Sequence, residues 1–166
     1  ALTDLPAGYD VAVTATDVAG NGATDATNNE LVIDTTDPVA PAALDLDAGS
    51  DTGITTDDIT SVTTPTISGT AEAGSTVNLT SDIAGIVVAT TVADGTTGAW
   101  SVPTTALDEG VHNLTATATD TAGNEGVAST SLAVTIDTTV TSAPTAPDLD
   151  AASDSGSADD DITSAT

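Results

Sequence analysis

Hydrophobic and polar residues alternate with a period of two along several short stretches of the chain. In residues 112–119 every second residue is His, Leu or Ala, and the residues between them are Asn or Thr. The same alternation surrounds Val77 and Leu79 and returns from Leu132 to Ile136. No stretch keeps the 3.6-residue period of an amphipathic helix, and Thr and Val favour extended backbone. The pattern predicts an all-β fold of short strands, each with one polar face.

The chain also repeats itself at an offset of 103 residues. The segment TATDVAGN at 14–21 returns as TATDTAGN at 117–124, and DLDAGSDTG at 45–53 returns as DLDAASDSG at 148–156. A unit of about 100 residues has the size of an immunoglobulin-like sandwich of two antiparallel sheets. We therefore expect tandem repeats of 103 residues, each folded as an immunoglobulin-like antiparallel β-sandwich.

This offset divides the chain into one complete unit and two partial ones. The expected order is the C-terminal part of one repeat at 1–36, a linker at 37–44, a complete repeat at 45–138, a linker at 139–147 and the N-terminal part of the next repeat at 148–166. Neither partial unit is long enough to bury a core alone. We expect the chain to be a stretch of a longer array, with prolines that stiffen its linkers.

The charge of the chain is entirely acidic, and this excludes several functions. There are 26 Asp and Glu residues and no Lys or Arg, which gives a formal net charge of −26. Without basic residues nothing neutralises phosphates, so neither nucleic-acid binding nor docking on anionic lipid is expected. No apolar run approaches the roughly 18 residues of a membrane-spanning helix, so no membrane insertion of this segment is expected.

The acids are concentrated in a loop that occurs twice, and they predict bound Ca²⁺. Ca²⁺ prefers about six to eight oxygen ligands, and Asp in a Gly-containing loop supplies them. The spacing is not that of an EF-hand, and a solvated acidic loop is the alternative. The candidate ligands in the first copy are Asp45, Asp47, Asp51, Asp57 and Asp58. Those in the second copy are Asp148, Asp150, Asp154, Asp160 and Asp161.

Further candidate ligands lie in a turn that follows a strand and at the end of each unit. They are Asp17 with Asn21, Asp120 with Asn124, and the acids Asp34 and Asp137. Plain turn chemistry is the alternative for the two Asp–Asn pairs, because Asn and Gly tolerate left-handed backbone. The expected grouping at one pole of the domain, around a shared ion, comprises Asp34, Asp45, Asp47, Asp120 and Asn124.

Catalysis is not expected. Asp51-Thr52-Gly53 matches the aspartic-protease tripeptide, but that chemistry needs two close carboxylates that share a proton. Here the tripeptide lies in a polar loop, and its second copy follows from the repeat. We expect His112 to have a structural role and Trp100 to belong to the core.

Three segments together resemble a bacterial immunoglobulin-like repeat: TPTISGTAEAGSTVNL at 64–79, GAWSVP at 98–103 and GVHNLTATATDTAGNEG at 110–126. Such repeats form the stalks of giant, type I-secreted surface adhesins and biofilm proteins, and the acidic loop resembles their calcium-dependent subgroup. The resemblance implies Ca²⁺ between domains and an extracellular location on the surface of a bacterium.

The function expected on these grounds is that of a structural extender. Its partners would be neighbouring repeats of the same chain and calcium ions. Two alternatives stay open, namely a module that binds carbohydrate or protein, and a subunit that self-associates into fibres or a surface layer. A binding module would be expected to expose an aromatic platform, and the chain has only one Trp and one Tyr.

Overall fold

The computed structural model describes residues 5–9, 13–24, 31–83 and 85–144, which form strands and loops without a helix. The first strands are β1 (Leu5–Tyr9), β2 (Thr14–Thr16), β3 (Gly22–Thr24) and β4 (Leu31–Ile33). The strands of the complete unit are β5 (Ala42–Leu46), β6 (Ile59–Thr60), β7 (Thr66–Thr70), β8 (Thr76–Ser81), β9 (Ile86–Val92), β10 (Ala99–Pro103), β11 (Gly110–Thr119) and β12 (Leu132–Ile136).

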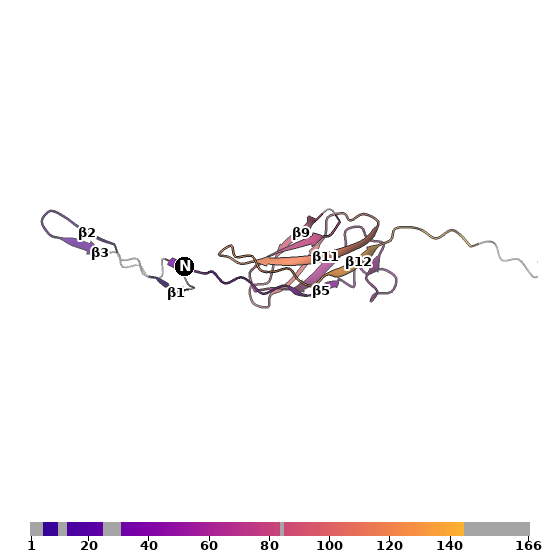
Figure 1. Ribbon diagram of the computed structural model, residues 1–166, viewed down its shortest axis with the longest axis horizontal. Coiled ribbons are helices and arrows are strands. Elements are labelled where there is room, and N and C mark those ends of the chain that lie inside the picture. Colours follow the sequence, from indigo (N-terminus) through magenta and orange to yellow (C-terminus); the bar gives the residue numbers. More distant parts are fainter. Residues whose placement is uncertain (1–4, 10–12, 25–30, 84, 145–166) are drawn as a thin grey trace, which may run out of the picture.

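The complete unit is a sandwich of two sheets (Figure 1). One sheet has the strand order β10-β7-β5, and the other has the order β6-β12-β11-β8-β9. All pairs are antiparallel except the short parallel pair of β6 with β12. This confirms the predicted all-β, immunoglobulin-like sandwich.

The core lies between the sheets, on the apolar face that the alternation predicted. In β11 the buried residues are His112, Leu114, Ala116 and Ala118. Trp100 is only 4% exposed, as expected for a core residue. Its indole lies against the backbone of the cross-strand residue Gly69, where an added Cβ would stand 2.6 Å from Cζ2 of Trp100.

The chain comes into the sandwich at one pole and leaves it at the other (Figure 1). The N-terminal pole carries the start of β5, paired with the end of β7, and the loop 120–126 after β11. The C-terminal pole carries the loop 47–58 and the end of β12, where the Asp137 N–H donates to the Thr60 carbonyl at 2.9 Å. The two connections of the domain are therefore separated by the length of the sandwich.

Part of the segment expected as a linker belongs to the sandwich. Pro38 and Pro41 are buried, and β5 already begins at Ala42. The pairing of β5 with β7 shifts register between Ala42 and Asp45, where Ala43 has a φ of 53°. The domain therefore begins before the expected boundary at residue 45, because the prolines pack against it instead of spanning a gap.

The N-terminal partial unit repeats one cross-strand pair of the complete unit. Tyr9 of β1 stands opposite Leu31 of β4. The residues 103 positions later, His112 and Val134, stand opposite each other in β11 and β12. This pair recurs at the offset, whereas the register of the rest of β1 differs, because Leu5 stands opposite Ile33 while Ile136 stands opposite Gly110.

Candidate functional site

The acidic loop, residues 47–58, is built around Asp47 at the C-terminal pole. Its carboxylate Oδ1 accepts the Gly49 N–H at 2.9 Å, and its carbonyl accepts the N–H groups of Ser50 at 2.7 Å and Asp51 at 3.0 Å. The Thr60 hydroxyl donates to the Ser50 carbonyl at 2.5 Å. These bonds tie the loop to β6 and fix the backbone position of Asp51.

Asp51 is the most unusual carboxylate of this loop. It is only 6% exposed, and its Oδ1 is buried without any hydrogen-bond partner. A buried polar atom that lacks a partner loses its water without compensation, which costs free energy. Such an atom in a native fold indicates a ligand, a water or a functional strain.

The environment of Asp58, close to Asp51, disfavours its ionised form. Burial raises the pKa of Asp58, and the negative charges of Asp45, Asp51 and Asp57 raise that pKa further. Its backbone is in the left-handed region at a φ of 56°, and its carbonyl accepts the Thr135 N–H at 2.9 Å. Four carboxylates therefore repel one another here, in a chain that has no Lys or Arg.

This loop offers chemistry that suits a hard cation. Carboxylate oxygens are the ligands that Ca²⁺ prefers, and Asp51 Oδ1 has no competing donor. Across the residues that the structure describes, no three His, Asp or Glu side chains converge closely enough to enclose a metal ion as they stand. The residues that would hold an ion are Asp51, Asp58 and Asp45, with Asp57 and Asp47 adjacent.

The two Asp–Asn turns have the same geometry as each other. The Asp120 Oδ1 accepts three backbone N–H groups, from Ala122, Gly123 and Asn124, at 2.8, 2.7 and 2.9 Å. Its Oδ2 accepts the Asn124 side-chain amide at 2.8 Å, and Asn21 donates to Asp17 Oδ2 at the same distance.

These hydrogen bonds account for both turns without an ion. Bonds from Asn124 and Asn21 lower the pKa values of Asp120 and Asp17. In each carboxylate both oxygens already accept protein donors. The expected ligand role of these four residues remains a prediction, and the structure gives them a role as turn-forming residues.

The expected grouping of five residues at one pole is only partly correct. The Asn124 side-chain Nδ2 donates to the Asp34 carbonyl at 3.2 Å, so these two residues do meet. Strand β5, however, carries Asp45 and Asp47 away from that pole, since Asp45 pairs with Ser68 and the Asp47 N–H reaches the Thr66 carbonyl. Asp45 and Asp47 thus do not join Asp34, and the acidic loop lies at the opposite end of the domain.

At the C-terminal pole a clasp that the sequence did not predict fixes the departing chain. The Glu109 carboxylate accepts the Thr138 N–H at 3.0 Å, the Thr138 hydroxyl at 2.7 Å and the Thr139 hydroxyl at 3.1 Å. Asp137 Oδ1 accepts the Thr139 N–H at 2.9 Å. Bonds from Thr138 lower the pKa of Glu109, and those from Thr139 lower that of Asp137.

The candidate ligands of the second acidic loop cannot be compared with the first. Asp148, Asp150, Asp154, Asp160 and Asp161 lie outside the residues that the structure describes. Their expected role stays a prediction.

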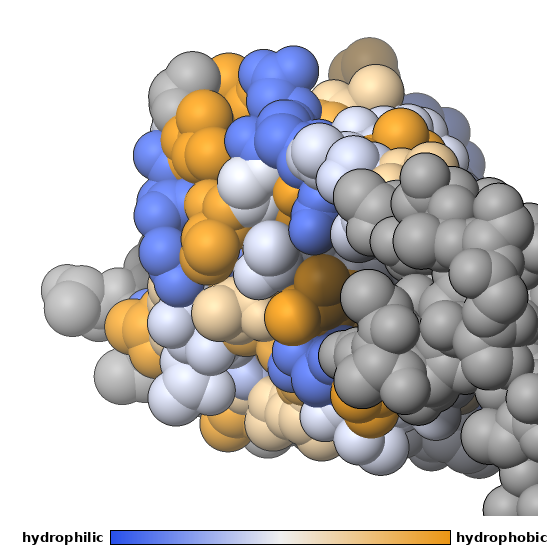
Figure 2. Space-filling model, turned by 90° about the vertical axis from the view of Figure 1, so that its right-hand side faces the viewer, coloured by the Kyte–Doolittle hydropathy of each residue, from blue (hydrophilic) through white to orange (hydrophobic). Residues whose placement is uncertain are grey.

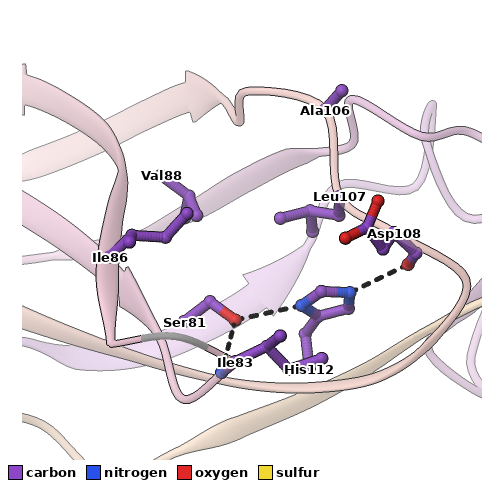
Figure 3. A pocket seen from close by; sticks show the side chains of 8 residues that line it. All are labelled: Ser81, Ile83, Ile86, Val88, Ala106, Leu107, Asp108 and His112. Carbon is purple, nitrogen blue, oxygen red and sulfur yellow. Dashed lines mark hydrogen bonds between the residues drawn. The ribbon is translucent and has the colours of Figure 1, made fainter.

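A small cavity of about 90 Å³ lies at the C-terminal pole beside His112 (Figure 3). The His112 Nε2 lies 2.9 Å from the Asp108 carbonyl, which only accepts, and Nδ1 lies 3.0 Å from Ser81 Oγ. Ser81 Oγ also accepts the Ile83 N–H at 3.3 Å. His112 is 2% exposed and held by a carbonyl where a catalytic histidine would have a carboxylate. This geometry supports the expected structural role.

The face at the C-terminal pole mixes polar and apolar side chains (Figure 2). Hydrophobic residues near this pole are exposed, among them Ile54 at 67% and Val111 at 53%. In the described part of the chain, no helix has the length and hydrophobicity needed to cross a membrane. This pole therefore exposes apolar side chains as well as carboxylates.

Comparison with known proteins agrees with this architecture. The sequence profile of the bacterial Ig-like domain matches residues 38–138, which include the buried Pro38 and all strands from β5 to β12. The comparison with curated proteins gives no significant match. Bacterial Ig-like domains are a non-enzymatic fold family and often occur in surface or extracellular proteins. On its sequence profile and its sandwich fold, the chain belongs to the bacterial Ig-like domain family.

Proposed function

We propose that the chain is a stretch of extender repeats from the stalk of a long extracellular bacterial adhesin. The observation that carries this proposal is the placement of the two chain connections at opposite poles of the sandwich (Figure 1). A domain connected in this way adds its full length to a tandem array. The pair Tyr9–Leu31, which recurs at an offset of 103 residues as His112–Val134, supports an array of equivalent units.

We further propose that Ca²⁺ binds the acidic loop and stiffens the array. The buried, partnerless Oδ1 of Asp51 and the repulsion felt by Asp58 support this proposal. The ion would supply the positive charge that the chain itself lacks. Because the ion would bind the folded loop and not the unfolded chain, it would raise the free energy of unfolding of the domain by RT ln(1 + [Ca²⁺]/Kd).

The alternative of a ligand-binding module has less support. Trp100 is buried in the core, so the chain's only Trp offers no exposed aromatic platform. Self-association has one favourable observation. The edge strand β9 carries no charged residue and exposes Ile86, Val87 and Val92 at 54, 54 and 62%.

Titration calorimetry on the chain tests the calcium proposal. We expect Ca²⁺ to bind at least tenfold more tightly than Mg²⁺, because Mg²⁺ demands a smaller octahedral shell and keeps its water. Asp51→Asn should weaken Ca²⁺ binding at least tenfold. The matched control is Glu72→Gln, which removes one charge from an exposed side chain that makes no hydrogen bond in the described structure. Equal losses in both variants would show that general charge, and not ligation, attracts the ion.

A further inference from the structure

We propose that the loop 120–126 is a docking surface for the segment that leaves the preceding repeat, and that this docking needs no metal ion. The partner is a segment of this same chain, residues Asp34 to Pro38. The proposal goes beyond calcium stiffening, because it places an ion-independent contact at the joint before the complete unit.

The polar part of the contact is the side chain of Asn124. Its Nδ2 donates to Asp120 Oδ2 at 2.8 Å and to the Asp34 carbonyl at 3.2 Å. Asp120 thus holds the amide in position to receive the incoming carbonyl. Both Asn124 and the Asp34 carbonyl are uncharged groups, so neither salt nor a chelator removes their attraction.

Hydrogen bonds within the docking loop hold its shape, since Asp120 accepts the N–H groups of Ala122, Gly123 and Asn124 and the Asn124 amide. The Asp17–Asn21 turn shares most of these bonds, with the Asn21 backbone N–H at 2.9 Å from Oδ1 and its amide at 2.8 Å from Oδ2. A preformed surface loses little conformational entropy when its partner docks.

The steric part of the contact is Gly126 against Pro38. A Cβ added to Gly126 would stand 2.2 Å from the Pro38 carbonyl oxygen. Neither backbone is free to retreat, because the Gly126 N–H bonds to the Ala118 carbonyl at 2.9 Å and Pro38 is buried. Only glycine permits this approach.

These two contacts leave a short joint between repeats. Asp34 and Pro38 are both held by the docking loop, so only residues 35–37 lie between them. Within that stretch the Thr36 N–H donates to Asp34 Oδ1 at 3.1 Å, which folds it into a turn. The orientation of the preceding unit is therefore restricted where the chain leaves β4.

The chain has no cysteine, so two introduced cysteines can carry spin labels at unique sites. Val32→Cys, at a residue that is 61% exposed before the joint, and Ala73→Cys, at an exposed turn residue of the N-terminal pole, give a distance across it. Pulsed electron–electron double resonance between the two spin labels measures the width of that distance distribution in excess chelator. Fluorescence of the buried Trp100 checks that the core stays folded.

We expect a narrow distribution in chelator for the labelled chain. Gly126→Ala should at least double its width, and Asn124→Ala should broaden it less. The matched control is Gly95→Ala, because a Cβ at Gly95 meets nothing within 4 Å. If Gly126→Ala loses the folded Trp100 signal, the Asn124→Ala width decides between docking and no docking.

Two results would overturn the proposal. One is a broad distribution in chelator that narrows only when Ca²⁺ is added, which would leave the calcium proposal intact and remove the ion-free contact. The other is an unchanged width in folded Gly126→Ala and Asn124→Ala chains.

Discussion

The side-chain amide of Asn124 donates to the main-chain carbonyl of Asp34, a residue 90 positions earlier in the sequence. This bond joins the start of the domain to the loop that follows its longest strand, β11. It makes the connection to the preceding unit a packed part of the domain. At the opposite pole the Glu109 clasp fixes the departing chain. Both connections of this bacterial Ig-like domain are thus oriented by contacts within the chain.

The pH dependence of stability should show that the ionised carboxylate of Asp58 destabilises the fold. Its pKa is raised in the fold above the ordinary value of 3.8, so the folded domain binds its proton more readily than the unfolded chain. Its contribution therefore lowers stability as pH rises from 3.8 through the folded pKa. In chelator, we expect Asp58→Asn to be more stable than the parent chain at pH 7, and Asn tolerates the left-handed backbone there.

Urea unfolding at pH 7 and pH 3.5 measures this difference. The advantage of Asp58→Asn should shrink at the lower pH, where the carboxyl of the parent chain is mostly protonated in both states. A variant that is less stable than the parent at pH 7 in chelator would contradict the assigned repulsion.

The contact between Gly69 and Trp100 should tolerate no side chain. A Cβ at Gly69 would lie 2.6 Å from Cζ2 and 2.9 Å from Cε2 of Trp100. We expect Gly69→Ala to lower the free energy of unfolding by about 2 kcal/mol, as overpacking of a core does. Unfolding followed by Trp100 fluorescence measures it, with Gly95→Ala as the control that stays within about 0.5 kcal/mol of the parent. A similarly small effect of Gly69→Ala would show that the indole moves aside easily.

The Glu109 clasp should slow hydrogen exchange at the Thr138 amide. We expect Glu109→Ala to speed that exchange at least tenfold while the core amides of β11 keep their protection, with Glu72→Ala as the control. The pKa of Glu109 is lowered from 4.5, so the clasp is complete above pH 4.5 and is lost as pH falls through the folded pKa. Unchanged exchange at Thr138 in Glu109→Ala would mean that the bonds are too weak to orient the chain.

Alternation predicted the sandwich well because burial on one face is what produces it. Val77, Leu79 and Leu114 are buried as the pattern indicated. The grouping of ligands failed for a geometric reason. Asp47 is close to Pro41 in sequence, but an extended strand rises by about 3.3 Å per residue, so five or six residues carry the chain most of the way across the sandwich.

The contacts at the two connections were harder to predict because they differ between the two copies. The position of Gly126 is occupied by Ala23 in the first copy, and that of Glu109 by Pro6. A comparison of the two copies therefore gives no indication that either residue makes a contact at a connection. The buried Asp51 was among the predicted ligands, but its missing hydrogen-bond partner depends on packing that no sequence pattern reports.

The central claim, a calcium-stiffened extender, is tested most directly by the shape of several units in solution. Three copies of residues 35–137 in tandem, measured by small-angle X-ray scattering, report both length and angular order. We expect a stiff, extended rod in millimolar Ca²⁺. In chelator the ion-free contacts should keep the rod extended, while repulsion between the acidic loop at the C-terminal pole of one unit and the carboxylates of the next unit should widen the range of angles between units. Identical scattering profiles with and without Ca²⁺, at equal flexibility, would contradict the account.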